Sequence, residues 1–188
     1  MKKGLIPLII RLEGSKNRLY KDPIGLYTIG VGHLVIKNDK NLIKVLGTDD
    51  ISKLQRIKMK ESQVAELLSL DLEIFIEDVT KRVKTVKNLE QHHLDALISL
   101  SFNIGRGAFK RSTLLMELLT DKPFSKVAQQ FVRWNKAGGR VLPGLVIRRI
   151  VETHLFLGAK ELIPSLTKKL KARHEEEVIT LLKTYWSS

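Results

Sequence analysis

Residues 61–83 read ESQVAELLSLDLEIFIEDVTKRV and carry the clearest structural signal in the sequence. Their apolar positions recur every three or four residues, which is the period of an α-helix with one buried face. These positions are Val64, Leu67, Leu68, Leu72, Phe75, Ile76, Val79 and Val83. We therefore expect one long helix here, connecting the part of the chain before it with the part after it.

The chain before this helix changes its pattern twice. Apolar residues at helical spacing predict a short amphipathic helix over 3–13 that ends before Gly14. Residues 18–36 instead combine strand-forming residues with Asp22-Pro23 and several glycines, so we expect a small, tightly turned antiparallel sheet. Residues 37–60 are mixed and polar, and their pattern predicts no particular element.

The chain after the long helix reads as helical. Gly- and Pro-containing breaks separate helices expected at about 90–104, 112–120, 125–135 and 143–157, and a charged amphipathic helix expected at 165–186. The predicted class is α+β, with a small antiparallel sheet lobe joined by a long helix to an all-helical lobe. The expected domain division is a sheet lobe at about 14–60, a connecting helix at about 61–83, a helical lobe at about 84–158 with residues 1–13, and a C-terminal extension at 159–188.

Composition limits the classes of function. The 188 residues include no cysteine, which excludes a disulfide framework and a thiol nucleophile. A net charge of +13 favours an anionic partner: nucleic acid, a membrane surface or a cell-wall polymer. The apolar run after the initial Met-Lys-Lys is short and lacks a small-residue cleavage site, so we interpret it as a helix of the mature protein rather than a signal peptide.

Glu13, Asp22 and Thr28 form a candidate catalytic group, because they fall on a predicted helix end, a turn and a strand of one small region. Glycoside hydrolysis needs a protonated carboxyl group for the leaving oxygen and a second polar site that handles water or stabilises the cationic sugar. Taken alone, a glutamate in so charged a chain is far more often a solvated surface group.

The surrounding motifs resemble those of the phage-type lysozymes, glycoside hydrolase family 24. The resemblance covers about residues 5–158 in the expected order. It rests on Leu12-Glu13-Gly14, Leu19-Tyr20-Lys21-Asp22 and the run from Gly25 to His33, on Ser101 to Gly105 with Ala108-Phe109 and Ser112 to Leu115, and on Arg133-Trp134-Asn135, Gly138-Gly139, Pro143-Gly144-Leu145 and Arg148-Arg149.

This resemblance implies hydrolysis of the β-1,4 bond between N-acetylmuramic acid and N-acetylglucosamine in bacterial peptidoglycan, without a cofactor. Glu13 would be the general acid, Asp22 would stabilise charge or help to activate water, and Thr28 would hold the attacking water. A water-mediated, inverting reaction requires carboxyl groups about 6.5–9.5 Å apart. The protein would stay in the host cytoplasm until it is released through the inner membrane, and it would then act on the wall in the periplasm.

Several further residues receive supporting roles. Glu13 must be partly buried to hold a proton, and the family resemblance implies an arginine beside it, Arg148 or Arg149, although two solvated arginines are an equal alternative. Asp71 falls on the apolar stripe of the long helix and therefore needs a partner, which the resemblance identifies as His33. The resemblance also implies substrate contacts for Leu34, Phe102 and Asn135, and for Leu34 core packing is an equally good account.

Three alternatives stay open. A lytic transglycosylase would use Glu13 without a water held by Asp22 and Thr28, and a non-catalytic basic protein would bind nucleic acid or membrane. Residues 165–186 either dock their leucine face on the helical lobe, which we favour, or bind anionic outer-membrane lipid or lipopolysaccharide. We expect a monomer, no nucleic-acid partner and no metal site, with His92 and His93 on the surface.

Overall fold

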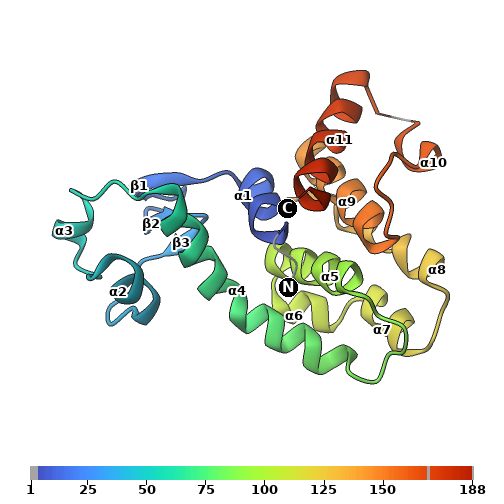
Figure 1. Ribbon diagram of the computed structural model, residues 1–188, viewed down its shortest axis with the longest axis horizontal. Helices are drawn as coiled ribbons and strands as arrows, with labels where there is room; N and C mark the ends of the chain where they lie inside the picture. Colours follow the sequence, from blue (N-terminus) through green and yellow to red (C-terminus); the bar gives the residue numbers. More distant parts are fainter. Residues whose placement is uncertain (1–3, 169, 188) are drawn as a thin grey trace. The chain divides into compact units, whose positions relative to one another are not determined.

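The computed structural model describes residues 4–168 and 170–187, which form two compact units. We call Ile9–Glu73 the sheet unit and the rest of the described chain the helical unit. The long helix α4 (Glu61–Val83) has the predicted bounds, and the division falls inside it, between Glu73 and Ile74 (Figure 1). The predicted α+β class is confirmed.

The sheet unit contains a three-stranded antiparallel sheet in the order β1-β2-β3. Its elements, with the helix that leads into it, are α1 (Leu5–Glu13), β1 (Lys16–Lys21), β2 (Tyr27–Gly30), β3 (His33–Leu34), α2 (Lys40–Leu46) and α3 (Ile51–Leu54). Lys16 pairs with Gly30 and Tyr20 with Thr28, so β1 is bulged between these two pairs. The central strand β2 is therefore held on both sides, and it carries Thr28.

The segment for which the sequence predicted no element forms α2 and α3. Asp39 and Asp50 cap the two helices, because their carboxylates accept hydrogen bonds from the backbone N–H groups of Leu42 and Lys53. Gly47 then ends α2 with φ of 75°, a left-handed conformation that glycine adopts without a steric penalty. Both helices thus follow standard capping rules that the mixed composition had obscured.

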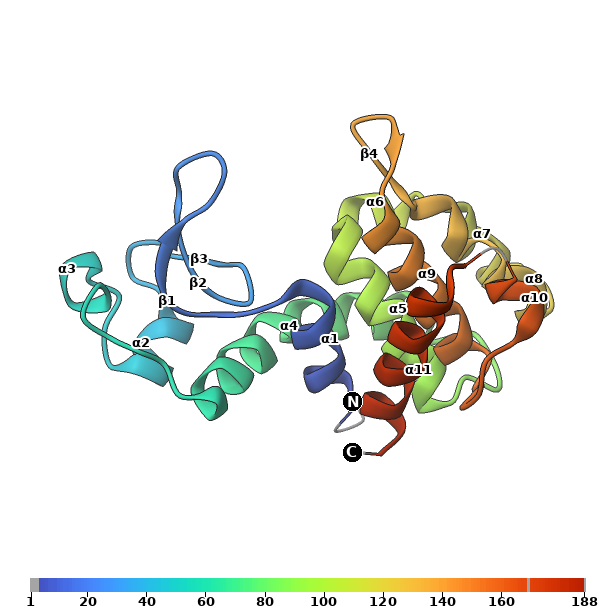
Figure 2. The same ribbon diagram turned by 90° about the horizontal axis from the view of Figure 1, so that it is seen from above.

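The helical unit is built around α9 (Pro143–Phe156), in which every residue from Ile147 to Phe156 is buried. This helix packs against α5 (Gln91–Ile104), the 3-10 helix η1 (Phe131–Trp134) and α11 (Ala172–Trp186). Figures 1 and 2 label the three α-helices. The remaining elements of the unit are α6 (Arg106–Lys110), α7 (Thr113–Leu119), α8 (Phe124–Ala128), β4 (Lys136–Ala137), β5 (Arg140–Val141) and α10 (Pro164–Thr167).

Three details of the sequence prediction for this unit are wrong. The helix expected at 125–135 is two short helices, α8 and η1. The unit is not all helical, because Gly138 and Gly139 both take positive φ and form the two-residue turn of the β4–β5 hairpin, which projects from the helices of its unit in Figure 2. The helix expected at 165–186 is divided into α10 and α11.

The favoured docking of the C-terminal helix is confirmed. Val178, Leu181, Leu182 and Tyr185 of α11 are buried, and the Tyr185 hydroxyl donates a hydrogen bond of 2.9 Å to buried Asp95 on α5. Gly4 fits against the backbone of Tyr185, where a Cβ atom would lie 2.1 Å from the carbonyl oxygen. The apolar face of α11 is therefore used inside the protein.

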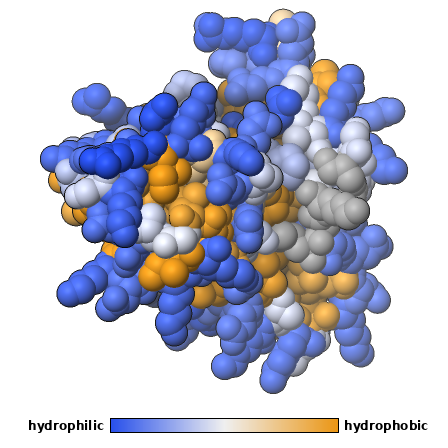
Figure 3. Space-filling view, turned by 60° about the vertical axis from the view of Figure 1, so that its left-hand side comes forward, coloured by the Kyte–Doolittle hydropathy of each residue, from blue (hydrophilic) through white to orange (hydrophobic). Residues whose placement is uncertain are grey.

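One face of the molecule shows how hydrophilic and apolar residues are distributed on its surface. The face drawn in Figure 3 is mostly hydrophilic with smaller apolar patches, in keeping with the 33 basic and 20 acidic residues. Within the described part of the chain, no helix combines the length and the apolar character needed to cross a membrane.

Candidate active site

Glu13 is the last residue of α1, and Gly14 follows it with φ of 74°. The glycine ends the helix and turns the chain into β1. The Glu13 side chain is exposed, which differs from the partial burial that the sequence predicted.

Asp22 and Thr28 belong to one hydrogen-bonded turn between β1 and β2. A single oxygen of Asp22, Oδ1, accepts hydrogen bonds from the backbone N–H groups of Ile24 at 3.0 Å and Leu26 at 2.8 Å. Thr28, which is 4% exposed, donates its hydroxyl hydrogen to the Leu26 carbonyl at 3.2 Å. The turn thus fixes the carboxylate and the hydroxyl through Leu26.

This arrangement leaves acceptor atoms for a water molecule. Across residues 4–168 and 170–187, no group donates a hydrogen bond to Oδ2 of Asp22. The Thr28 oxygen has lone pairs left, because its only described bond uses its hydrogen. Both oxygens can therefore accept a hydrogen bond from water.

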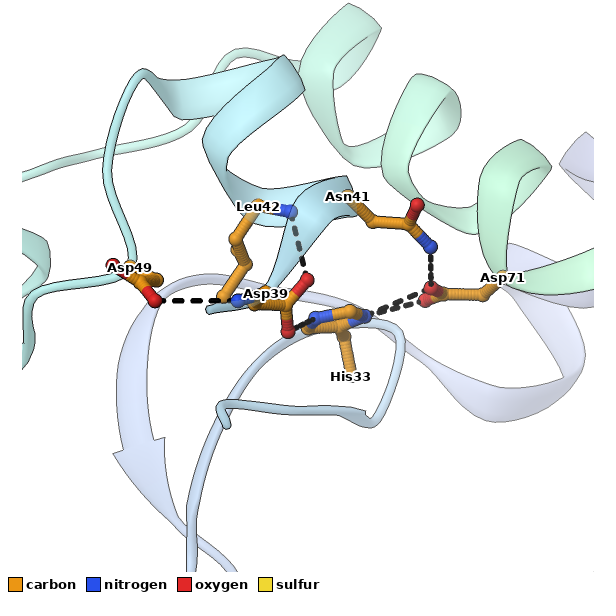
Figure 4. A network of polar contacts seen from close by, with 6 residues as sticks. All are labelled: His33, Asp39, Asn41, Leu42, Asp49 and Asp71. Carbon is orange, nitrogen blue, oxygen red and sulfur yellow. Dashed lines mark hydrogen bonds and ion pairs between the residues drawn. The ribbon is translucent and has the colours of Figure 1, made fainter. Parts of the chain in front are cut away.

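His33 lies at the centre of a polar network in the sheet unit (Figure 4). Its Nδ1 lies 2.8 Å from Oδ2 of Asp71 on α4, and its Nε2 lies 2.8 Å from Oδ2 of Asp39. Asn41 donates to Asp71, and the Asp39 backbone N–H donates to Asp49. The structure therefore brings His33 and Asp71 together and adds a second carboxylate.

The two carboxylates decide the charge of His33. Burial disfavours the imidazolium, but the hydrogen bonds and negative charges of Asp71 and Asp39 outweigh this effect and raise the pKa of His33 above 6.5. A charged imidazolium that donates one hydrogen to each carboxylate connects β3, α2 and α4. This is a structural role, and it positions the strand next to Thr28.

Arg148 and Arg149 are buried, so the alternative of two solvated arginines is wrong. Both lie beside fully buried Glu152 on the same helix, at 3.1 Å for Arg148 and 3.2 Å for Arg149. Ser99 on α5 donates to Glu152 at 2.7 Å, and Arg149 donates to Asn103. Any contribution of either arginine to Glu13 stays a prediction.

The three substrate candidates lie on different elements. Leu34 on β3 pairs with Thr28 and is 44% exposed, which argues against the core-packing account. Phe102 on α5 is half-buried and contacts the edge of Phe75, with ring centroids 5.3 Å apart. Asn135 follows η1, and its carbonyl accepts from Leu142 across the base of the hairpin. Leu34 belongs to the sheet unit, and Phe102 and Asn135 belong to the helical unit.

The adjacent histidines of α5 are not the surface pair that we expected. His93 is buried, and its Nδ1 accepts from the Glu90 backbone N–H at 2.9 Å. Burial and the neighbouring charge of His92 lower the pKa of His93 to about 4. Within the described residues, no three His, Cys, Asp or Glu side chains are grouped so that they could hold a metal ion.

Comparison with known proteins decides the family. The family model for phage lysozyme matches residues 10–152, which include Glu13, Asp22 and Thr28. The chain belongs to the phage lysozyme family. Outside this match lie most of α1 and the whole of α10 and α11.

Proteins of similar sequence agree with this family assignment. The endolysin of Bacillus phage B103 is 38% identical over 154 residues, which cover 81% of this chain and 52% of that protein. The endolysin of Salmonella phage P22 is 38% identical over 148 residues, covering 78% and 90%. The chain thus spans about half the length of the Bacillus phage endolysins that it matches.

Solved structures of similar fold support the architecture of the family. A mutant of P22 lysozyme aligns with a TM-score of 0.65 and 31% identity, covering 84% of this chain and 99% of that one. The muramidase domain of SpmX from Asticaccaulis excentricus also aligns with a TM-score of 0.65, at 28% identity, covering 83% and 96%.

Sequence reasoning missed two residues that hold predicted supporting residues in place. Asp39 binds the second nitrogen of His33, and its place before α2 matches a helix-capping aspartate. Glu152 holds both buried arginines, and its spacing of four residues from Arg148 is that of an ion pair along a helix. The apolar residues around Glu152 were the signal that this helix is buried on all sides.

Proposed function

We propose that this protein is an endolysin that hydrolyses the β-1,4 bond between N-acetylmuramic acid and N-acetylglucosamine in peptidoglycan. Glu13 is the general acid, and Asp22 and Thr28 position the attacking water. The turn that joins Asp22, Leu26 and Thr28 is the observation that carries this proposal, because it holds both side chains through the backbone of Leu26 and leaves each with an acceptor oxygen. Membership of the phage lysozyme family supports the same roles.

Proton transfer requires that Glu13 be shielded from water during the reaction. Its side chain is exposed in the free protein. We therefore propose that the bound glycan itself covers Glu13 and favours its neutral form by desolvation. After the proton leaves, the carboxylate gains from a cation nearby, for which Arg148 or Arg149 is the candidate.

The water enters from the side of the sugar that faces Asp22. In this proposal Oδ2 of Asp22 accepts one hydrogen of the water and Thr28 accepts the other. As the water oxygen bonds to the anomeric carbon, Asp22 takes a proton from the water, and the leaving oxygen takes the proton of Glu13. Such a displacement inverts the configuration at that carbon. Leu34, Phe102 and Asn135 are proposed to contact the saccharide.

The proposed site of action is the cell wall, after release from the host cytoplasm. Peptidoglycan is the proposed partner, and the protein is proposed to act as a monomer. The buried apolar face of α11 argues against the alternative in which residues 165–186 insert into lipid or lipopolysaccharide. The strongly basic surface instead favours accumulation at an anionic wall.

Lysis of outer-membrane-permeabilised Gram-negative cells tests this proposal. We expect Glu13→Gln to lower the rate of turbidity loss by about 10²–10⁴-fold, because general acid catalysis contributes about this factor. Glu66→Gln, which makes the same change at an exposed position of α4, serves as the matched control and should keep the wild-type rate.

Product analysis of digested sacculi separates hydrolysis from the transglycosylase alternative. Hydrolysis leaves reducing-end muramic acid, whereas an intramolecular reaction leaves a 1,6-anhydro product. A full lytic rate in Glu13→Gln would overturn the assignment of Glu13. A 1,6-anhydro product from the wild type would overturn the roles of Asp22 and Thr28.

A further inference from the structure

A cavity of about 750 Å³ lies in the sheet unit, on the strand that connects Glu13 with Asp22. Its volume falls in the range of small-ligand sites, about 300–1,000 Å³. Buried Met59 and Val64 and half-buried Leu19 contribute apolar surface to its wall. Neither the proposed general acid nor the proposed water site lines this cavity.

The rim of the cavity is strongly cationic and contains one acid. The exposed side chains of Arg11, Lys16 and Arg18 line it, together with exposed Glu61 at the start of α4. Lys16 lies over the ring of Tyr20, with its Nζ 4.1 Å from the ring centroid. Three cations and one carboxylate around an apolar wall suit a ligand that is mainly anionic, carries one positive group and has small apolar parts.

The backbone at this place suits a peptide rather than a phosphate polymer. β1 is an edge strand, so no strand of the described sheet pairs with the side of its backbone that faces away from β2. Only at Asn17 does a described backbone group outside the sheet bond to β1, where its carbonyl accepts from the Met59 N–H at 2.8 Å. An extended peptide can pair with such an edge while its side groups enter a pocket.

We propose that this cavity binds the peptide stem of peptidoglycan, an inference that rests on the proposed function. A stem carries free carboxylates for Arg11, Lys16 and Arg18, alanine methyl groups for the apolar wall and, in walls that contain diaminopimelate, an amino group for Glu61. Part of the cavity wall, residues 15–20, lies between Glu13 and Asp22 in the sequence. We therefore expect the stem to belong to the glycan that these residues engage.

Binding of a free stem tetrapeptide that contains diaminopimelate, measured by calorimetry on the full chain, tests this inference. We expect saturable binding by the wild type and a Kd raised about tenfold or more in the double variant Lys16→Gln with Arg18→Gln. Lys40→Gln with Lys44→Gln removes two exposed charges of the same unit on α2, outside the cavity, and should change Kd less than twofold.

Three further ligands or variants test the ligand class. Glu61→Gln should weaken binding of the tetrapeptide but not of a tetrapeptide whose diaminopimelate amine is acetylated. A glycerol phosphate oligomer represents the alternative ligand class, an anionic phosphate polymer, and its Kd is measured in the same way. Tighter binding of this oligomer than of the tetrapeptide, equal weakening by both double variants, or no saturable peptide binding would each overturn the inference.

Lysis of permeabilised cells by the same protein preparations separates this inference from the proposed function. If the wild type lyses cells but does not bind the tetrapeptide, the stem site is wrong and the lysozyme assignment stands. If the wild type binds the tetrapeptide but does not lyse cells, the proposed function is wrong.

Discussion

His33 in the sheet unit and His93 in the helical unit are both largely buried, yet their environments drive their protonation in opposite directions. His33 lies between two aspartates, which raise its pKa. His93 lies among Phe124, Phe156 and His92, and burial lowers its pKa to about 4. The difference teaches that burial alone does not set the charge of a histidine, because the polar partners at its two nitrogens decide whether desolvation is outweighed.

The same contrast holds for the other buried polar groups. The sheet unit places charge in a network centred on one imidazolium, which connects a strand to two helices. The helical unit holds His154 between the Ile150 carbonyl and the Ile163 N–H, and burial lowers the pKa of His154. Its buried charged residues include the cluster of Arg148, Arg149 and Glu152. Acid should therefore weaken the helical unit while it leaves the His33 network charged.

The largest expected effect comes from breaking the ionic cluster of the helical unit. Glu152→Gln should lower the free energy of unfolding by about 4 kcal/mol, because it removes the buried carboxylate that pairs with two buried guanidinium groups. Urea unfolding at pH 7 measures this loss. Glu176→Gln, at an exposed position of α11, is the control and should change the free energy by less than about 0.5 kcal/mol. An equal effect of both substitutions would contradict the cluster's importance.

A smaller effect, with a defined pH dependence, is expected in the sheet unit. Asp71→Asn should cost about 3 kcal/mol at pH 5, because the charged His33 then loses one of its two carboxylates. The folded-state pKa of His33 is raised above its unfolded value, so this stabilisation is fully present below about pH 6.5 and is lost as pH rises through the folded pKa.

The measurement is the difference in unfolding free energy between wild type and variant from pH 5 to pH 10. This difference should narrow as pH rises. Asp78→Asn provides the control on the same helix, because Asp78 pairs with Arg82 near the surface and should contribute less than about 1 kcal/mol. A gap of constant size across the pH range would show that the charge of His33 does not stabilise the fold.

The smallest expected effect on stability comes from His93, and its pH dependence is opposite to that of His33. Its folded-state pKa of about 4 lies below the unfolded value of 6.5, so its stabilisation is present above pH 6.5 and is lost as pH falls. The wild type should lose about 2 kcal/mol from this residue between pH 7 and pH 5.

His93→Gln isolates this titration, because glutamine can accept the same hydrogen bond from the Glu90 N–H without binding a proton. The variant should be less stable at pH 7 but should lose less stability on going to pH 5. If the free energy of unfolding changed with pH in the same way for wild type and variant, protonation of His93 would not contribute to the loss of stability in acid.

The elements that the sequence predicted well are those with a strong local hydrophobic period or with clear residues that begin or end a helix. The bounds of α4 agree with its apolar stripe, and α5, α7 and α9 begin within one residue of the predicted starts. The short helices α2 and α3 went unrecognised because each contributes a single buried residue, Leu42 or Leu54, so their stripes are too short to detect. The β4–β5 hairpin was missed because its two glycines were interpreted only as a helix break.

For the candidate site too, local features were predictable from the sequence and features that depend on distant contacts were not. Local spacing and family resemblance were enough to select Glu13, Asp22 and Thr28, since all three lie within sixteen residues of one another on adjacent elements. The exposure of Glu13 and the burial of His93 depend on which surfaces other elements cover, and these elements are far away in the sequence. Such contacts produce no periodic pattern in the sequence.

What the sequence by itself determined is therefore the α+β class, the long helix and the order of the site residues along the chain, because hydrophobic period, glycine position and helix caps act over a few residues. Only the tertiary structure decided that His33 holds two carboxylates, that Glu152 pairs with both arginines, and that α11 docks on α9. The physical reason is that desolvation and charge pairing depend on neighbours in space, and these neighbours are brought together only when the chain folds.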